Sequence, residues 1–249
     1  MVSDARATND LGEFNKEASG MARARKHHVQ QQLFRHGGKR RGAGRKPKGP
    51  RASERHKTRP HLAYYHPVHV TLRIVGDIRN LRTRDLYKAL RWATLSVARK
   101  QQHRFRIVHI SIQHNHVHLI CEARDRMSLA RGVQGFEVSA AKHVNRTLGR
   151  RGRVFADRYH ARHLKSPRSV KHAVSYVLNN WRHHGADRGK TWLVDPFSSG
   201  IRFRGWKELA GATVMWKPPP IYDPLWVWLP QTWLLQQAHG AVSARAVPG

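Results

Sequence analysis

The chain has 249 residues, and its 47 Lys and Arg against 15 Asp and Glu give a formal net charge of +32 at pH 7. A charge of this sign and size predicts a polyanionic partner, because each phosphate that Lys or Arg neutralises releases condensed counterions, and we expect that partner to be nucleic acid. No stretch is long and apolar enough to span a membrane, the first residues lack an apolar signal core, and Cys121 is the single cysteine, so we expect a cytoplasmic protein with no membrane partner and no disulfide framework.

Residues 1–60 are expected to form a basic, flexible DNA-binding arm. They contain few large apolar side chains, and from Met21 onward Glu54 is the one acid among many Lys and Arg, so the segment cannot bury a core. Its glycine-interrupted cations are similar to an AT-hook, which lies in a narrow A·T minor groove; a non-specific phosphate-binding arm is the equal alternative. The expected DNA contacts are Lys39, Arg40, Arg41, Arg45, Lys46, Lys48 and Arg51.

Residues 62–189 are expected to form one α+β domain. Apolar and polar side chains alternate from Val68 to Ile74, which predicts a half-buried strand, and Thr83 can cap the helix that follows. The predicted elements of this half are a strand over 68–74, a helix that begins after Thr83, and strands over 106–112 and 116–121 joined by a tight hairpin at 113–115.

The sequence of the second half of the domain completes the order of strands and helices. This sequence predicts a helix capped by Ser128 that ends near Gly149, a strand over 154–164, and a helix that begins at Ser166-Pro167 and ends at Gly185. The order β-α-β-β-α-β followed by a further helix is typical of the split βαβ, or ferredoxin-like, arrangement, an antiparallel sheet with helices on one face and the other face open for a site.

Residues 190–249 are rich in Trp and Pro and show no clear period. We expect a C-terminal extension that packs across the domain, with a short helix or strand near Trp233. Tryptophans that stack on unpaired bases are the alternative.

His116 and His118 are the strongest indication of chemistry. One residue apart on a strand, they project to the same side about 7 Å apart, while Val117 and Leu119 point into the core. Such a pair is a compact half-site for a divalent metal. Two surface histidines remain the alternative in a chain with 19 of them, and a structural zinc site would need a second ligand cluster that the sequence does not offer.

The last helix of the domain offers a nucleophile. His172, Tyr176 and Asn180 lie four residues apart and therefore share one helix face. A tyrosine at the boundary of the core is the ordinary interpretation of this spacing. Beside a metal that polarises a phosphodiester, however, the Tyr176 hydroxyl could attack the phosphorus.

Two segments resemble the HUH endonucleases, and most closely the REP-associated tyrosine transposases of the IS200-like, single-tyrosine group. They are Gln113 to Ile120, which contains the two histidines, and Ser175 to Asn180, which contains the tyrosine. The resemblance covers about residues 62–206, including Asp195 to Ser199 after the tyrosine helix. It implies an HUH-type catalytic domain that acts on single-stranded or hairpin DNA in a bacterial, nucleoid-associated setting, as a monomer or homodimer.

By that resemblance, His116 and His118 are metal ligands for Mg²⁺ or Mn²⁺, Asn180 takes the place of a third oxygen ligand, and Tyr176 is the nucleophile. The implied reaction is transesterification that leaves a 5′-phosphotyrosine. Alternatives for the third ligand are His172, Asp157 and His160, and Arg182 is expected to line the DNA path. The alternative function is a non-catalytic DNA-binding or regulatory protein in which Tyr176 only packs.

Overall fold

The computed structural model describes residues 59–100, 103–209, 222–237 and 242–245. The arm predicted over residues 1–60 therefore lies outside the described residues except for its last two positions. The same holds for its seven expected DNA contacts, Lys39, Arg40, Arg41, Arg45, Lys46, Lys48 and Arg51. No helix of the described segments is long and apolar enough to cross a membrane.

Four strands form one sheet in the order β2-β3-β1-β4. Every neighbouring pair in it is antiparallel. The strands are β1 (Val68–Arg73), β2 (Phe105–Ile112), β3 (His116–Ala123) and β4 (His160–His163). With helices after β1 and β3, this is the ferredoxin-like arrangement, so the predicted fold class is confirmed.

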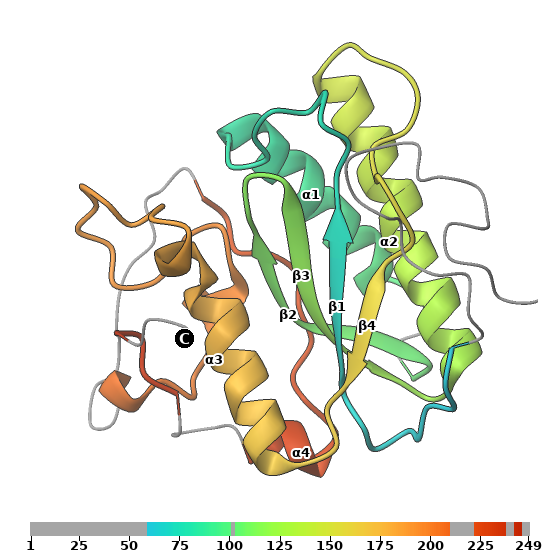
Figure 1. The fold of residues 1–249 in the computed structure, drawn as a ribbon, viewed down its shortest axis with the longest axis vertical. Helices are drawn as coiled ribbons and strands as arrows, with labels where there is room; N and C mark the ends of the chain where they lie inside the picture. The colour runs from blue at the N-terminus through green and yellow to red at the C-terminus, as the bar shows by residue number, and fades with distance from the viewer. Residues whose placement is uncertain (1–58, 101–102, 210–221, 238–241, 246–249) are drawn as a thin grey trace, which may run out of the picture. The chain divides into compact units, whose positions relative to one another are not determined.

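Helices α1 (Arg84–Ala98) and α2 (Arg126–Thr147) cover one face of the sheet (Figure 1). Strand alternation turns Val68, Val70 and Leu72 of β1 toward this layer, where they are almost fully buried. The Thr83 hydroxyl accepts the Leu86 N–H at the start of α1, as the sequence predicts. The polar residues of β1 are thereby turned to the other face.

Helix α3 (Pro167–His183) lies on that second face (Figure 1). The Ser166 hydroxyl caps its first turn with Pro167 at the first helical position, and Gly185, at φ 64°, follows its end. Its apolar residues pack over Ile120 of β3. The sheet face that was predicted to be open is therefore partly covered by α3. This helix carries Tyr176, the candidate nucleophile.

Two predicted boundaries are wrong. The N-cap of α2 is Asp125, not Ser128, whose N–H the Asp125 carboxylate accepts; both residue types cap helices well, so the sequence offers two starts. The strand expected over 154–164 pairs regularly only over β4. The chain bends at Asp157, a residue type that strands disfavour, and upstream only Phe155 forms an isolated bridge, to Ile74.

The C-terminal residues cover the outer edge of β2. Ser198 bridges Ser111, and the Trp228 N–H donates to the Ile107 carbonyl. The short helices of this region are η1 (Ser199–Arg202), η2 (Lys207–Leu209) and α4 (Trp233–Gln236). The described part of the extension packs across the domain, as expected. It covers backbone N–H and C=O groups at the edge of β2, to which another strand could otherwise bind.

Candidate active site

His116 and His118 project from β3 onto the face that α3 covers. Their Nε2 atoms lie 3.0 Å apart. Across the sheet, Thr71 on β1 lies opposite both His118 and His160, so these three side chains share that face. The rings thus converge much more closely than the spacing of their backbone positions requires.

Hydrogen bonds behind the two rings set which nitrogen carries the proton. The Nδ1 of His116 donates to the Asn115 side-chain oxygen, 2.7 Å away. The Nδ1 of His118 lies 3.1 Å from the His69 Nε2 and 3.2 Å from the Thr71 hydroxyl. With Nδ1 of His118 donating to His69, both rings of the pair direct an Nε2 lone pair at each other.

Burial keeps these rings neutral. It lowers the pKa of His116 and of His69 to about 4, and that of His118 well below 6.5, and the electrostatic effect of neighbouring His and Arg side chains lowers these pKa values further. When both rings carry their proton on Nδ1, the two Nε2 lone pairs face each other at 3.0 Å and can bind one cation between them. Adjacent ligands of an octahedral ion at about 2.1 Å are about 3.0 Å apart, so the pair fits a divalent metal.

Helix α3 places Tyr176 above the pair. Its ring centroid lies 5.4 Å from that of His118 and 6.0 Å from that of His69. Two turns further on, the His184 ring lies 5.4 Å from that of His116. The tyrosine side chain is partly exposed.

Asn180 lies on the same helix face, one turn from Tyr176 and one from His184. It is fully buried, and within the described segments neither atom of its side-chain amide has a hydrogen-bond partner. A buried amide without a partner costs free energy.

The described residues contain no set of three or more His, Cys, Asp or Glu side chains arranged to hold a metal. The alternatives His172, Asp157 and His160 therefore do not complete the pair as they stand. His172 and His160 are exposed, and Asp157 lies at the bend before β4. Asn180 lies on the same face of α3 as Tyr176, and its role as third ligand stays a prediction.

Sequence reasoning missed His69 and Thr71 as site residues. Their signal was present, because both belong to the polar half of the alternating β1 pattern and neighbour His118 across the sheet. What the sequence does not give is the register that brings β1 beside β3.

A buried ion pair fixes the hairpin that carries the histidines. The Arg82 guanidinium donates to both carboxylate oxygens of Asp195, at 2.8 and 2.9 Å, and also to the Ile112 carbonyl. The Leu81 N–H donates to the His114 carbonyl. The segment after α3 and the turn before His116 are therefore held to one another.

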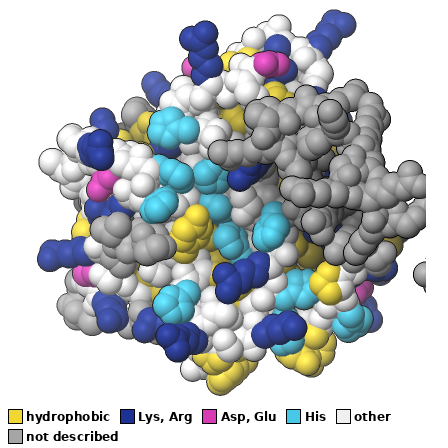
Figure 2. Space-filling view, in the orientation of Figure 1, with side chains coloured by type: hydrophobic (Ala, Val, Ile, Leu, Met, Phe, Trp, Pro, Cys, Tyr) yellow, Lys and Arg dark blue, Asp and Glu magenta, His cyan; other side chains and the backbone are white. Residues whose placement is uncertain are grey.

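The Arg182 side chain is hydrogen-bonded to other residues of the chain. Its guanidinium donates to the carbonyls of Leu193 and Ala244 and to Asp187. It braces the chain after α3, and its expected contact with DNA stays a prediction. Around the site, Figure 2 shows histidines gathered in the middle of this face, with Lys and Arg about them and few acids.

The domain combines a ferredoxin-like sheet, two histidines on one face of it, and a tyrosine on the helix that covers this face. Residues 63–180 match the family described as "Transposase IS200 like". The match runs from just before β1 to Asn180 within α3, and thus includes the histidine pair and Tyr176. This part of the chain is similar to the IS200-like transposase family.

Among solved structures, the chain is similar to one described as "Structure of the REP associates tyrosine transposase bound to a REP hairpin". The two share 18% sequence identity over 72% of this chain and 93% of that chain, with a TM-score of 0.45. The comparison with curated proteins finds no match.

Proposed function

We propose that the domain is a metal-dependent single-stranded DNA endonuclease and transesterase that acts at hairpin-associated sites. One observation carries the proposal: the Tyr176 ring lies 5.4 Å from that of His118, whose Nε2 faces the His116 Nε2 at 3.0 Å. This geometry supports a nucleophile and a place for a divalent ion on one face of the domain.

His116, His118 and Asn180 would hold the ion, Mg²⁺ or Mn²⁺. When bound, it polarises the phosphodiester and stabilises charge that develops on its oxygens. The Tyr176 oxygen attacks the phosphorus and loses its proton, the bond from phosphorus to the 3′-oxygen breaks, and that oxygen becomes a 3′-hydroxyl. The product is a 5′-phosphotyrosine, which conserves the ester energy, so no ATP is needed.

Tyr176→Phe tests this chemistry, because it removes only the attacking oxygen. With hairpin DNA labelled on the 5′-phosphate side of the cleavage site and Mn²⁺, we expect the unmodified protein to retain label on a denaturing gel and the variant to retain none. Binding should change little. Tyr64→Phe, at a tyrosine that is 69% exposed, is the matched control. Label retained by the Tyr176 variant would overturn the assignment.

The alternative is a DNA-binding or regulatory protein of transposase descent that no longer cuts. The observation that favours it is that the third position holds an amide, Asn180, which binds metal more weakly than a carboxylate. The same gel decides between the two functions, because such a protein would bind the hairpin and form no adduct in either metal.

A further inference from the structure

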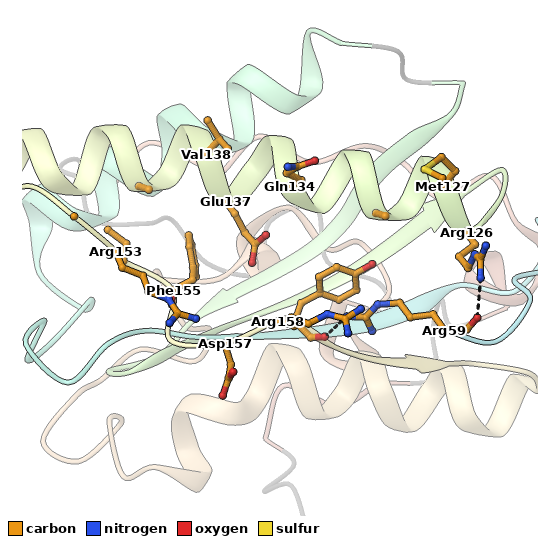
Figure 3. Close-up of a pocket in the computed structure, with 15 residues that line it drawn as sticks. Arg59, Arg126, Met127, Gln134, Glu137, Val138, Arg153, Phe155, Asp157 and Arg158 are labelled. Atoms are coloured by element: carbon orange, nitrogen blue, oxygen red, sulfur yellow. Dashed lines mark hydrogen bonds between the residues drawn. The ribbon is translucent and has the colours of Figure 1, made fainter. Parts of the chain in front are cut away.

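A cavity lies away from the histidine pair, on the side of the sheet that α1 and α2 cover. It has a volume of about 760 Å³ and lies between α2 and residues 152–159 (Figure 3). We call it the α2 groove. Its apolar lining includes Phe155 and Val154, which are buried, and Met127 and Val138, which are exposed. Its cations are Arg59, Arg126, Arg153 and Arg158.

Glu137 points from α2 into this groove, whereas Asp157 points away from α2 (Figure 3). Burial raises the pKa of the Glu137 carboxyl to about 7, against the opposing effect of the Arg59 charge. Within the described segments, Glu137 forms no ion pair. The charged form of this carboxyl therefore lacks the partner that burial ordinarily demands.

The Tyr159 hydroxyl is a second polar group at the cavity without a hydrogen-bond partner in the described residues. The Tyr159 side chain lines the groove and is 8% exposed. Arg59 is fixed beside it, with its guanidinium 3.7 Å from the ring centroid and donating to the Tyr159 carbonyl. A buried hydroxyl and a half-buried carboxyl line one cavity, and neither is hydrogen-bonded to a described residue, which indicates a ligand with polar edges.

The side chains that line the groove indicate the chemical class of this ligand. Apolar walls suit a flat ring, arginines suit a phosphate, and an acceptor-only carboxylate suits two adjacent N–H groups. Guanine is the DNA base whose pairing edge presents a ring N–H beside an amino group, and that edge is free only when the base is unpaired. We propose that the α2 groove binds one unpaired guanine nucleotide, with its base edge on Glu137 and its phosphate on the arginines.

This site does not depend on the proposed cleavage reaction. Fluorescence anisotropy of the full chain with two labelled pentamers, all thymine and thymine with a central guanine, measures the preference in metal-free buffer. We expect about tenfold tighter binding of the guanine pentamer. Glu137→Gln should remove that difference and leave the all-thymine affinity unchanged, whereas Asp85→Asn, an exposed acid on α1, should preserve it.

Competition with free deoxyguanosine monophosphate distinguishes the two sources of the nucleotide. Displacement of the guanine pentamer shows a site for free nucleotides as well, and its absence shows a site for a nucleotide within a strand. Equal affinity for the two pentamers, or a guanine preference that survives in Glu137→Gln, would overturn the proposal. Should Glu137→Gln fail to fold, Tyr159→Phe must weaken the preference instead. Adduct formation through Tyr176 should persist in both variants, so the two proposals fail separately.

Discussion

Single residues behind the histidine pair decide what the pair can bind. The Asn115 oxygen accepts the Nδ1 proton of His116, and with His69 accepting that of His118 both Nε2 atoms can act as ligands. The sequence predicted His116, His118 and Tyr176 because each lies in a short pattern with local spacing. It could not predict His69, whose role depends on a neighbouring strand rather than on spacing along the chain.

His69→Leu should weaken Mn²⁺ binding about tenfold, because His118 loses the acceptor that fixes its tautomer while Thr71 still holds the ring in place. His69→Gln keeps an acceptor and should lose less. Isothermal titration calorimetry with Mn²⁺ alone measures both variants without reference to cleavage. His172→Leu, at an exposed histidine of α3, is the control and should bind as the unmodified protein does.

The raised pKa of Glu137 predicts how the free energy of unfolding depends on pH. Its folded pKa is about 7 and its ordinary value is 4.5, so the folded protein holds this proton over that window while the unfolded chain releases it. The Glu137 contribution to stability is therefore lost as pH rises from 4.5 through 7. Glu137→Gln should match the unmodified protein near pH 4.5 and be more stable by about 1–2 kcal/mol above pH 7.5, after allowance for partial solvent screening. Urea unfolding at the two pH values tests this, and an equal difference at both would contradict it.

At the scale of elements, helices with strong periods and caps were predicted well, as the starts of α1 and α3 show. For the extension, the sequence predicted the short helix near Trp233 but not the path of residues 222–237 along the sheet, because these residues have no period and are held by long-range bonds. Glu122 on β3, for example, accepts the backbone N–H groups of Gln231 and Thr232 at the start of α4 while it pairs with Arg106. A bond of this kind leaves no trace in local sequence.

Two glycines of α2 give opposite predictions for the same substitution. A Cβ at Gly132 would lie 2.1 Å from the buried Phe105 ring, whereas a Cβ at Gly135 would meet nothing within 4 Å. Gly132→Ala should therefore destabilise the fold by about 1–3 kcal/mol. Gly135→Ala should stabilise it by about 0.5–1 kcal/mol, because alanine loses less backbone entropy in a helix. Urea unfolding measures both, and a shift of the same sign would refute the packing of β2 against α2.

For the whole molecule, the dominant property is the net charge of +32, which the arm and the domain share. The IS200-like domain explains where chemistry is expected but not why so many cations precede it. A positively charged arm raises affinity for any nucleic acid and carries no information about the bond to be cut. We therefore expect arm and site to be separable in experiments.

Alanine at Arg40, Arg41, Arg45 and Lys46 tests that separation. Each phosphate that the arm no longer neutralises lowers the slope of log affinity against log salt by about 0.7 on single-stranded DNA, so removal of these four cations should lower it by about 3. Adduct formation through Tyr176 should persist at low salt, because the substitutions leave the site untouched. The control variant removes the same charge at four exposed positions of the domain, Arg79, Arg84, Lys88 and Arg204. If both variants shift the slope equally, net charge rather than contact by the arm sets the affinity, and the predicted role of the arm is wrong.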